Sequence, residues 1–214
     1  AVDRLGHLVP TERVLIVTNA ALVDEIWNQV PKLPPKALIG EPCRRDTAPC
    51  IGLAALSIVQ NDPEGVMAVM PSDHVIAPDD KFQQAISLAA DLVEESPQRI
   101  VTFGIRPSYP AESFGYIERG AAVDLSARGT SGTGMTAYQV RQFREKPKAE
   151  LARQYLAAGS FYWNAGIFVW KAATILQALE QREPEMFAHL SAIAAAMDIL
   201  RYQEVLAREF TAIR

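Results

Sequence analysis

Three near-continuous apolar runs, rich in Val and Ile, recur along the first half of the chain with helical patterns between them. These runs are RVLIVTN (13–19), VMAVM (66–70) and RIVTFGI (99–105). A strand that is apolar at successive positions is buried on both faces, as in a parallel sheet covered by helices. The alternation of strands and helices implies right-handed crossovers. The sequence therefore predicts an α/β fold built on a doubly wound, mostly parallel sheet.

Two helical patterns lie between these runs and differ in their apolar surface. The stretch 79–95 places its apolar residues on one face, which is typical of an amphipathic helix at the surface. The stretch 46–60 is apolar nearly all round, so we expect it to be deeply buried. It opens with Asp46 and Thr47, and either residue is a plausible N-cap.

The pattern changes in the second half of the chain. We expect a small antiparallel sub-sheet there, with strands at 115–123, 137–145 and 161–170. A helix over 148–159 is closed by Gly159, since glycine commonly ends helices. The remainder, 171–214, has helical patterning, so C-terminal helices complete the expected fold.

Composition excludes several classes of partner. The 214 residues suit one sizeable domain. A net charge of −4 does not indicate the basic surface that binds nucleic acid or an anionic membrane. There is no apolar run near the length of a membrane-spanning helix and no signal-peptide pattern at the start. Two cysteines, Cys43 and Cys50, suit a reducing compartment. We therefore expect a cytoplasmic protein.

One carboxylate stands where a predicted buried strand ends. In VMPSDHVI, Pro71 stops the apolar run, and Ser72, Asp73 and His74 follow it. Ligands of open α/β sheets bind outside the carboxyl ends of the strands, and Mg²⁺ is usually held by one or two carboxylates together with substrate phosphates. Asp73 is therefore a candidate Mg²⁺ ligand. The alternative is that Asp73 caps a turn through its own backbone, as Asp often does.

A second candidate is the stretch FREKP (143–147), which sets Glu145 beside Lys146 at the end of a predicted strand. Adjacent strand residues point to opposite faces, so both side chains can face one groove only if the strand bulges or bends there. Two readings stay open. Either both are solvated charges, or Lys146 pairs with a phosphate and Glu145 with hydroxyl groups.

Glycines mark two more positions of interest. In YWNAGIF (162–168), Asn164 and Gly166 interrupt an aromatic strand, and glycine inside a strand often marks a bulge or the close approach of a ligand. A purely structural bulge is the alternative. Gly115 similarly precedes a strand in FGYIERG. The stretch GTSGTG (129–134) looks like a phosphate cradle, but it is followed by a strand rather than a helix, so we expect a mobile loop.

Taken together, five stretches resemble one family. They are EPCRRDTAPCIGLAAL, VMPSDHVI, TFGIRPSYPAESFGYIERG, FREKP and YWNAGIF. Their order and spacing are similar to those of mannose-1-phosphate guanylyltransferases, a family of sugar nucleotidyltransferases. The resemblance implies a Rossmann-like nucleotide-diphospho-sugar transferase fold. It also implies an enzyme that transfers GMP from GTP to mannose 1-phosphate, with Mg²⁺ as cofactor, giving GDP-mannose and pyrophosphate.

The resemblance also implies roles for individual residues. Asp73 would hold the catalytic Mg²⁺, and Lys146 would share its work of neutralising phosphate charge. The nucleotide-binding residues it implies are Glu41, Arg45, Asp46, Thr47, Ala48, Ser72 and Asp73. The sugar-binding residues it implies are Gly115, Tyr116, Glu145, Lys146, Asn164 and Gly166. Asp46 departs from the family, which usually has asparagine there. An aspartate accepts hydrogen bonds from guanine but donates none, so the base contact changes.

Two family features are not found in these residues. The sequence has neither the glycine-rich G-G-x-G-T-R loop that holds the triphosphate nor the S-I-D-Y stretch with a second metal-binding aspartate. We therefore expect residues 1–214 to form a single nucleotidyltransferase domain that is incomplete at both ends. The alternatives are a non-catalytic relative that binds nucleotide sugars and an enzyme for another sugar phosphate. Monomer and homodimer both stay open.

Overall fold

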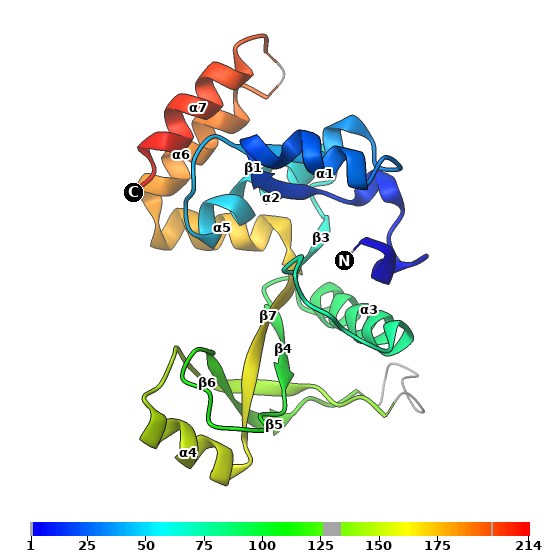
Figure 1. Ribbon diagram of the computed structural model, residues 1–214, viewed down its shortest axis with the longest axis vertical. Helices are drawn as coiled ribbons and strands as arrows, with labels where there is room; N and C mark the ends of the chain where they lie inside the picture. The colour runs from blue at the N-terminus through cyan, green and yellow to red at the C-terminus, as the bar shows by residue number, and fades with distance from the viewer. Residues whose placement is uncertain (1, 126–133, 198) are drawn as a thin grey trace.

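A computed structural model describes residues 2–125, 134–197 and 199–214, and shows an elongated α/β molecule (Figure 1). Its strands are β1 (Ile16–Asn19), β2 (Leu38–Glu41), β3 (Val66–Val69), β4 (Val101–Ile105), β5 (Tyr116–Ala122), β6 (Tyr138–Arg144) and β7 (Phe161–Lys171). Its helices are α1 (Val23–Gln29), α2 (Thr47–Asn61), α3 (Asp79–Glu95), α4 (Ala149–Ala158), α5 (Ala172–Arg182), α6 (Pro184–Ala194) and α7 (Tyr202–Ala212). Short 3₁₀ helices lie at Val2–Leu5, Thr11–Arg13, Ala20–Leu22 and Pro35–Ala37. The glycine-rich stretch at 129–134 lies outside the described residues apart from Gly134.

The helices expected from periodicity are confirmed. Helix α3 has the predicted bounds, and its buried residues are the apolar side chains of one face. Helix α2 begins one residue after Asp46, which occupies the N-cap position without a side-chain capping bond. Helix α4 ends at Gly159, whose φ of 66° is left-handed, a conformation that glycine adopts without strain.

The expectation of a mostly parallel sheet is wrong for the described residues. Strands β1 and β2 form a parallel pair, whereas the five-stranded sheet, in the order β3–β7–β5–β6 with β4 also on β7, is antiparallel in every pairing. The apolar runs of β3 and β4 do run in the same direction as each other. They are separated by β7, which runs antiparallel between them. An apolar run indicates burial on both faces but carries no information about the direction of the neighbouring strand.

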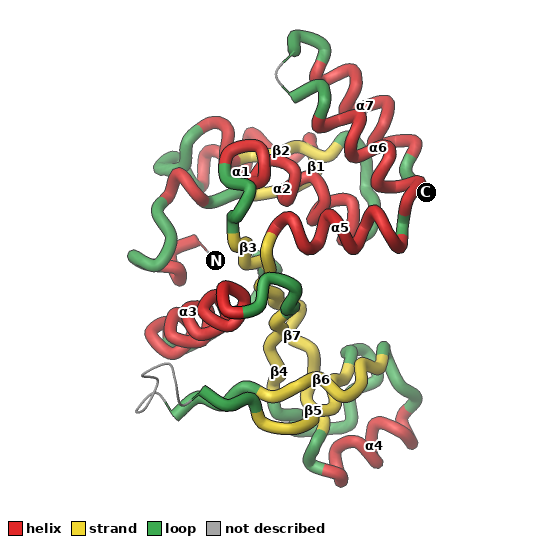
Figure 2. The backbone as a smooth tube through the Cα atoms, turned by 180° about the vertical axis from the view of Figure 1, so that it is seen from behind, coloured by secondary structure: helices red, strands yellow, loops and turns green. Residues whose placement is uncertain are grey.

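The long strand β7 organises the sheet. Its 11 residues span about 35 Å. Its first half pairs with β5 through residues 161–163, and its second half pairs with β3 through residues 168–171. Strand β4 occupies the opposite edge of β7. Figure 2 shows β7 running from the helical part of the molecule down into the sub-sheet of β5 and β6, which is packed against α4.

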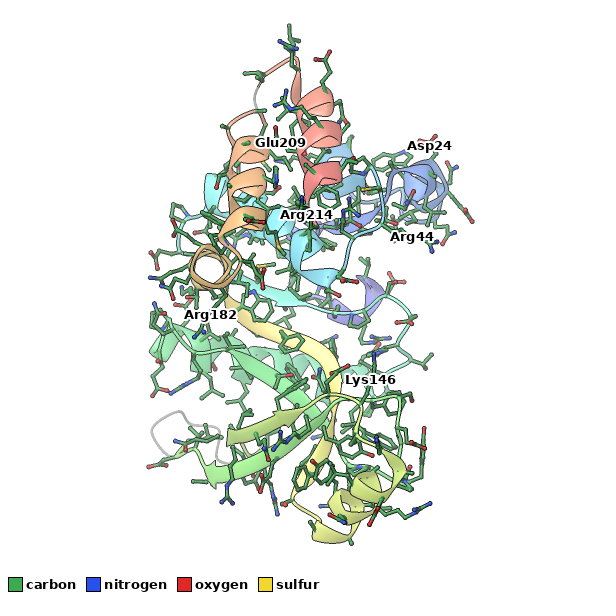
Figure 3. All side chains as sticks on the ribbon, turned by 90° about the vertical axis from the view of Figure 1, so that its left-hand side faces the viewer. Asp24, Arg44, Lys146, Arg182, Glu209 and Arg214 are labelled. Carbon is green, nitrogen blue, oxygen red and sulfur yellow. The ribbon has the colours of Figure 1, made fainter. Side chains whose placement is uncertain are left out.

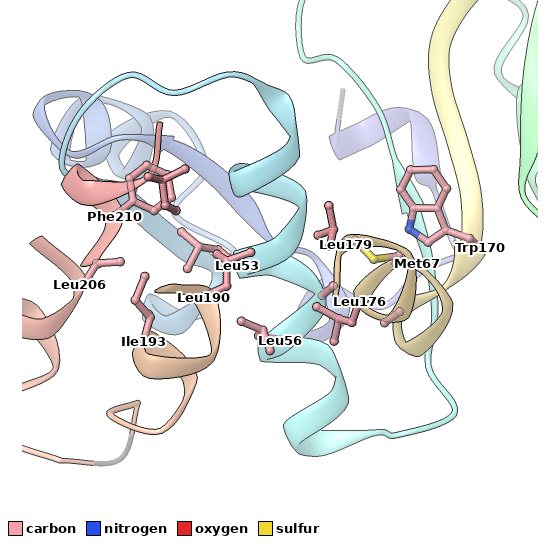
Figure 4. Packing of buried hydrophobic residues seen from close by; sticks show 13 residues of the cluster. Leu53, Leu56, Met67, Trp170, Leu176, Leu179, Leu190, Ile193, Leu206 and Phe210 are labelled. Carbon is pink, nitrogen blue, oxygen red and sulfur yellow. The ribbon is translucent and has the colours of Figure 1, made fainter. Parts of the chain in front are cut away.

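Two hydrophobic clusters confirm that β3 is buried from both sides. Met67 belongs to a cluster that contains Trp170 and residues of α2, α5, α6 and α7, as Figure 4 shows. Val66 and Ala68 pack against a second cluster built around α3. Helices therefore cover both faces of β3, and the nearly all-round apolar α2 is buried as expected, with Leu53 fully enclosed.

The described part of the chain has no helix long and apolar enough to cross a membrane. Cys43 and Cys50 are free thiols. Burial, aided by the charge of Glu41, raises the pKa of the Cys50 thiol to about 11. Cys50 is therefore protonated at neutral pH and a poor nucleophile.

Candidate functional site

The sheet topology brings four sequence-predicted stretches to one place. Strands β3 and β5 pair with the same edge of β7, and residues 164–167 of β7 lie between the two pairings. The carboxyl end of β3, which leads to Asp73, therefore faces the start of β5, which follows Gly115. Strand β6 ends at the same level, because Arg144 pairs with Tyr116. We call residues 164–167 the β7 bulge and use it as the reference point of the site.

The β7 bulge is an irregular segment with its own hydrogen bonds. Thr102 of β4 pairs with Phe168 and Gly104 pairs with Asn164, so Phe103 alone lies opposite residues 165–167. The backbone N–H of Gly166 donates to Asn164 Oδ1 at 3.2 Å. Gly166 has a φ of 67°, which favours glycine, and a Cβ placed on it would lie 3.4 Å from Cγ of Pro71. The bulge therefore lies beside the turn that carries Ser72 and Asp73.

The FREKP stretch bends as its sequence required for both charges to share a surface. Lys146 has a φ of 40°, which is left-handed and unusual for a residue with a side chain. This bend brings Lys146 Nζ to 3.4 Å from Glu145 Oε1, and both side chains are mostly exposed, at 64% and 62%. Figure 3 shows Lys146 near β7, between the sub-sheet and the helical part of the molecule. Left-handed strain in residues with side chains occurs preferentially at functional sites.

Gly115 connects the bulge to the Glu145–Lys146 pair. Its carbonyl accepts a hydrogen bond from the backbone N–H of Asn164 at 2.8 Å. A Cβ placed on Gly115 would lie 3.0 Å from Glu145 Oε2 and 3.2 Å from the ring of Phe143. Glycine at this position therefore allows the Glu145 carboxylate to sit against the backbone. The structure thus brings together five predicted sugar-side residues: Gly115, Glu145, Lys146, Asn164 and Gly166.

Tyr116, the remaining predicted sugar-side residue, has its side chain elsewhere. It is fully buried, its hydroxyl donates to the carbonyl of Ala111 at 3.0 Å, and its ring lies 5.3 Å from that of Tyr155. The structure assigns this side chain to the core between the sub-sheet and α4. Only the backbone of Tyr116 lies near the bulge.

Asp73 lies in an exposed bend after β3, next to exposed Ser72. In the described part of the chain its carboxylate makes no hydrogen bond and no ion pair, so the turn-capping alternative has no support. Arg4 holds this segment by donating to the carbonyl of His74 at 2.6 Å. No group of three His, Cys, Asp or Glu side chains that could enclose a metal is found among the described residues. A single uncommitted carboxylate still fits Mg²⁺, because that ion often binds through one or two carboxylates plus phosphates.

The predicted nucleotide-binding residues other than Ser72 and Asp73 form a second group, where β2 ends and α2 begins. Arg45, Asp46 and Thr47 are exposed, and Ala48 is half-buried in the first turn of α2. Glu41 Oε1 is buried without a hydrogen-bond partner in the described structure, and burial raises the pKa of this carboxyl. Arg45 donates to the backbone carbonyl of Thr211 near the end of α7. That bond ties this loop to the C-terminal helices.

Sequence reasoning missed two residues that contact this site. Arg4 reaches the Asp73 segment from a distant part of the chain, which no local pattern could show. Thr102 lies in an apolar run that was interpreted only as a buried strand. Its hydroxyl lies 3.1 Å from Asn164 Oδ1. Polar residues inside an apolar run are the signal that could have drawn attention to it.

A comparison with known protein families identifies the family of this chain. The family described as "Nucleotidyl transferase" matches residues 8–206. The chain belongs to the nucleotidyl transferase family. The candidate site described above lies within the matched residues.

Individual family members are similar over most of this chain. A mannose-1-phosphate guanylyltransferase of Escherichia coli is 39% identical over 199 residues, which cover 92% of this chain. The xanthan biosynthesis protein XanB of Xanthomonas campestris is 41% identical over 150 residues, or 70% of this chain. These alignments cover only 40% and 29% of the two relatives, so the chain spans well under half of their length.

The fold also agrees with a solved structure. The crystal structure described as mannose-1-phosphate geranyltransferase from Thermus thermophilus superposes with a TM-score of 0.79 at 25% identity. The match covers 99% of this chain and 56% of that one. The mixed arrangement of a small parallel and a larger antiparallel sheet is therefore part of an α/β fold shared with this solved structure.

Proposed function

We propose that the protein to which these residues belong transfers GMP from GTP to mannose 1-phosphate, giving GDP-mannose and pyrophosphate. The observation that carries the proposal is the meeting of Asn164, Gly166, Gly115 and the Glu145–Lys146 pair around the β7 bulge, beside the Asp73 turn. The substrates are taken from the name of a relative at 39% identity, a mannose-1-phosphate guanylyltransferase. The residues in and around the bulge offer the polar groups that would bind a sugar phosphate.

The residues around the bulge divide this work by their chemistry. Asn164 offers amide donors and Glu145 offers carboxylate acceptors, and sugar hydroxyls can bond with both. Lys146 offers an exposed ammonium for a phosphate. A phosphate oxygen of mannose 1-phosphate attacks the α-phosphorus of GTP, and pyrophosphate leaves. Because both reactants are polyanions, the main tasks are to align them and to stabilise the charge that develops on the α-phosphate.

Asp73 is the residue that would hold a Mg²⁺ ion. When bound, that ion would neutralise phosphate charge. The part played by this chain is to present an exposed carboxylate that has no competing partner in the described structure. Arg4 holds the backbone on one side of Asp73, and Pro71 on the other side lies beside Gly166. The turn that carries Asp73 is thus held next to the bulge.

The test is a substrate comparison with the natural full-length protein. Pyrophosphate release is measured for GTP and the other nucleoside triphosphates, each with mannose 1-phosphate and with glucose 1-phosphate. The proposal predicts the highest kcat/KM for GTP with mannose 1-phosphate. A preference for another pair would make the protein a nucleotidyltransferase of different specificity. Binding of GDP-mannose without any turnover would make it a nucleotide-sugar-binding relative.

A further inference from the structure

The hydrogen bonds inside the β7 bulge determine how the amide of Asn164 is turned. Two groups meet its Oδ1 atom: the backbone N–H of Gly166 at 3.2 Å and the hydroxyl of Thr102 at 3.1 Å. The N–H of Gly166 can only donate, so the atom that faces it must be the amide oxygen. The reversed amide would set two donors against each other. The Asn164 side chain is therefore fixed in one orientation.

This orientation leaves the amide nitrogen available. An asparagine amide has two N–H donors on Nδ2, and no acceptor for them is found among the described residues. Asn164 is only half-buried, and its backbone bonds to Gly115 on one side while Gly166 lies beside Pro71 on the other. Two free donors are thus held between the sub-sheet and the Asp73 turn.

Thr102 has a choice of two acceptors. Its hydroxyl also lies 3.1 Å from the backbone carbonyl of Ile167. Ile167 lies where the regular pairing of β4 with β7 is interrupted. A hydroxyl has one proton to donate. When that proton goes to Asn164 Oδ1, Thr102 and Gly166 together hold the amide. When it goes to Ile167, Thr102 merely satisfies a carbonyl of the bulge.

We propose that Thr102 is a positioning residue for the sugar phosphate. Its hydroxyl, with the Gly166 N–H, holds Asn164 Oδ1 so that Asn164 Nδ2 donates to an oxygen of mannose 1-phosphate. The inference rests on the proposed function. It adds a residue that makes no contact with substrate and acts only through the orientation of Asn164.

The experiment uses steady-state kinetics of the natural full-length protein. Thr102→Val removes the hydroxyl and keeps the side-chain shape, whereas Thr102→Ser keeps the hydroxyl. Loss of one net hydrogen bond predicts that Thr102→Val raises KM for mannose 1-phosphate by about tenfold. KM for GTP changes less than about twofold, and Thr102→Ser restores most of the affinity for mannose 1-phosphate, as expected if the hydroxyl alone matters.

A double-mutant cycle separates positioning from a purely structural role. If Thr102 acts through Asn164, then Thr102→Val has less than about a twofold effect on KM in an Asn164→Ala background. An undiminished effect in that background would overturn the inference, as would equal changes in KM for both substrates or no recovery with serine.

Asn164→Asp still tests the inference if Thr102→Val does not fold. An aspartate still accepts from Thr102 and Gly166 but has lost the Nδ2 donors, so the fold is retained and KM for mannose 1-phosphate rises. A folded Asn164→Asp protein with unchanged KM would contradict the inference. If the unaltered protein turns over but these variants keep its KM for mannose 1-phosphate, the inference fails alone. If the unaltered protein shows no turnover with mannose 1-phosphate, the proposed function and the inference fall together.

Discussion

Gly166 lies beside Pro71, which follows the neighbouring strand β3: a Cβ on the glycine would lie 3.4 Å from Cγ of the proline ring, and the glycine has a φ of 67°. The contact itself is ordinary, so the main penalty of Gly166→Ala is the left-handed backbone, about 1–2 kcal/mol. We expect this loss of stability in urea denaturation. We also expect a higher KM for mannose 1-phosphate, because the bulge holds Asn164.

Gly159→Ala is the matched control for that variant. Gly159 has nearly the same φ, 66°, and nothing within 4 Å of a Cβ placed on it. It should lose a similar amount of stability and keep normal kinetics, because it lies at the end of α4 away from the bulge. Equal kinetic effects in both variants would contradict the role given to the bulge.

Lys146 allows strain and charge to be separated at one position. Its φ of 40° costs a residue with a side chain about 1 kcal/mol or more, and glycine tolerates it. We expect Lys146→Gly to be at least as stable as Lys146→Ala. Both should lower kcat about 10²–10³-fold through loss of the ammonium. Comparing urea midpoints and pyrophosphate release for the two variants tests this, and a less stable glycine variant would argue against backbone strain.

Lys171 is a buried ammonium that pairs with Glu94. Its side chain is 6% exposed, and its Nζ donates to both carboxylate oxygens of Glu94 at 2.9 and 2.8 Å and to the carbonyl of Glu64 at 2.7 Å. We expect Glu94→Ala to cost about 2 kcal/mol in urea denaturation, since it leaves the ammonium without its carboxylate. The control, Glu64→Ala, removes a carboxylate that is 86% exposed at 3.9 Å and keeps the backbone carbonyl. Similar losses in both variants would refute the assignment.

Glu209 predicts a pH-dependent contribution from the α6–α7 pair. Hydrogen bonds from His189 at 2.8 Å and from Arg208 hold the pKa of this carboxyl below its ordinary value. A lowered folded pKa stabilises the protein above the unfolded value of about 4.3, and this stability is lost as pH falls through the folded pKa. Glu209→Gln should therefore lower Tm at pH 7, and the difference should shrink as pH falls below about 4.

Glu204→Gln serves as the control for the pH series. Glu204 lies on the same helix in an exposed ion pair with Arg201, at 3.0 Å and with both side chains at least 70% exposed. Such exposed pairs contribute about 0–1 kcal/mol, so this variant should change Tm little at pH 7. A Tm difference for Glu209→Gln that stays constant down to pH 3 would contradict the assignment.

Local pattern predicted the helices better than it predicted the sheet. The bounds of α3 follow from the alternation of one apolar and one polar face, which depends only on nearby residues. Strand direction depends on which segment arrives next to it, and β7 comes from about 100 residues further along the chain than β3. Both runs form strands, and β3 is covered on both faces as its apolar run predicts, whereas β4 is half-buried with its last two residues exposed. The antiparallel neighbour that the two strands share does not follow from either run.

The parts of the candidate site that depend on local backbone conformation could be predicted from the sequence. The contacts between residues far apart in the sequence could not. Gly166 inside a strand indicated a bulge, and Glu145 and Lys146 could face one groove only if the strand bent; the structure has both the bulge and the bend. Tyr116 looked equally suitable from its neighbours, but its side chain faces the core, because the sub-sheet packs against α4. Thr102 reaches Asn164 from a different strand, a contact that no local pattern encodes.

The most direct test of the whole account is pyrophosphate release from GTP and mannose 1-phosphate by the natural full-length protein and its Asp73→Asn variant. Asp73 is exposed beside the bulge, so the amide should fold normally while losing the charge. We predict turnover by the unaltered protein and a fall of about 10²–10³-fold in kcat for the variant. A fall of less than about threefold would contradict the placement of the reaction at this site.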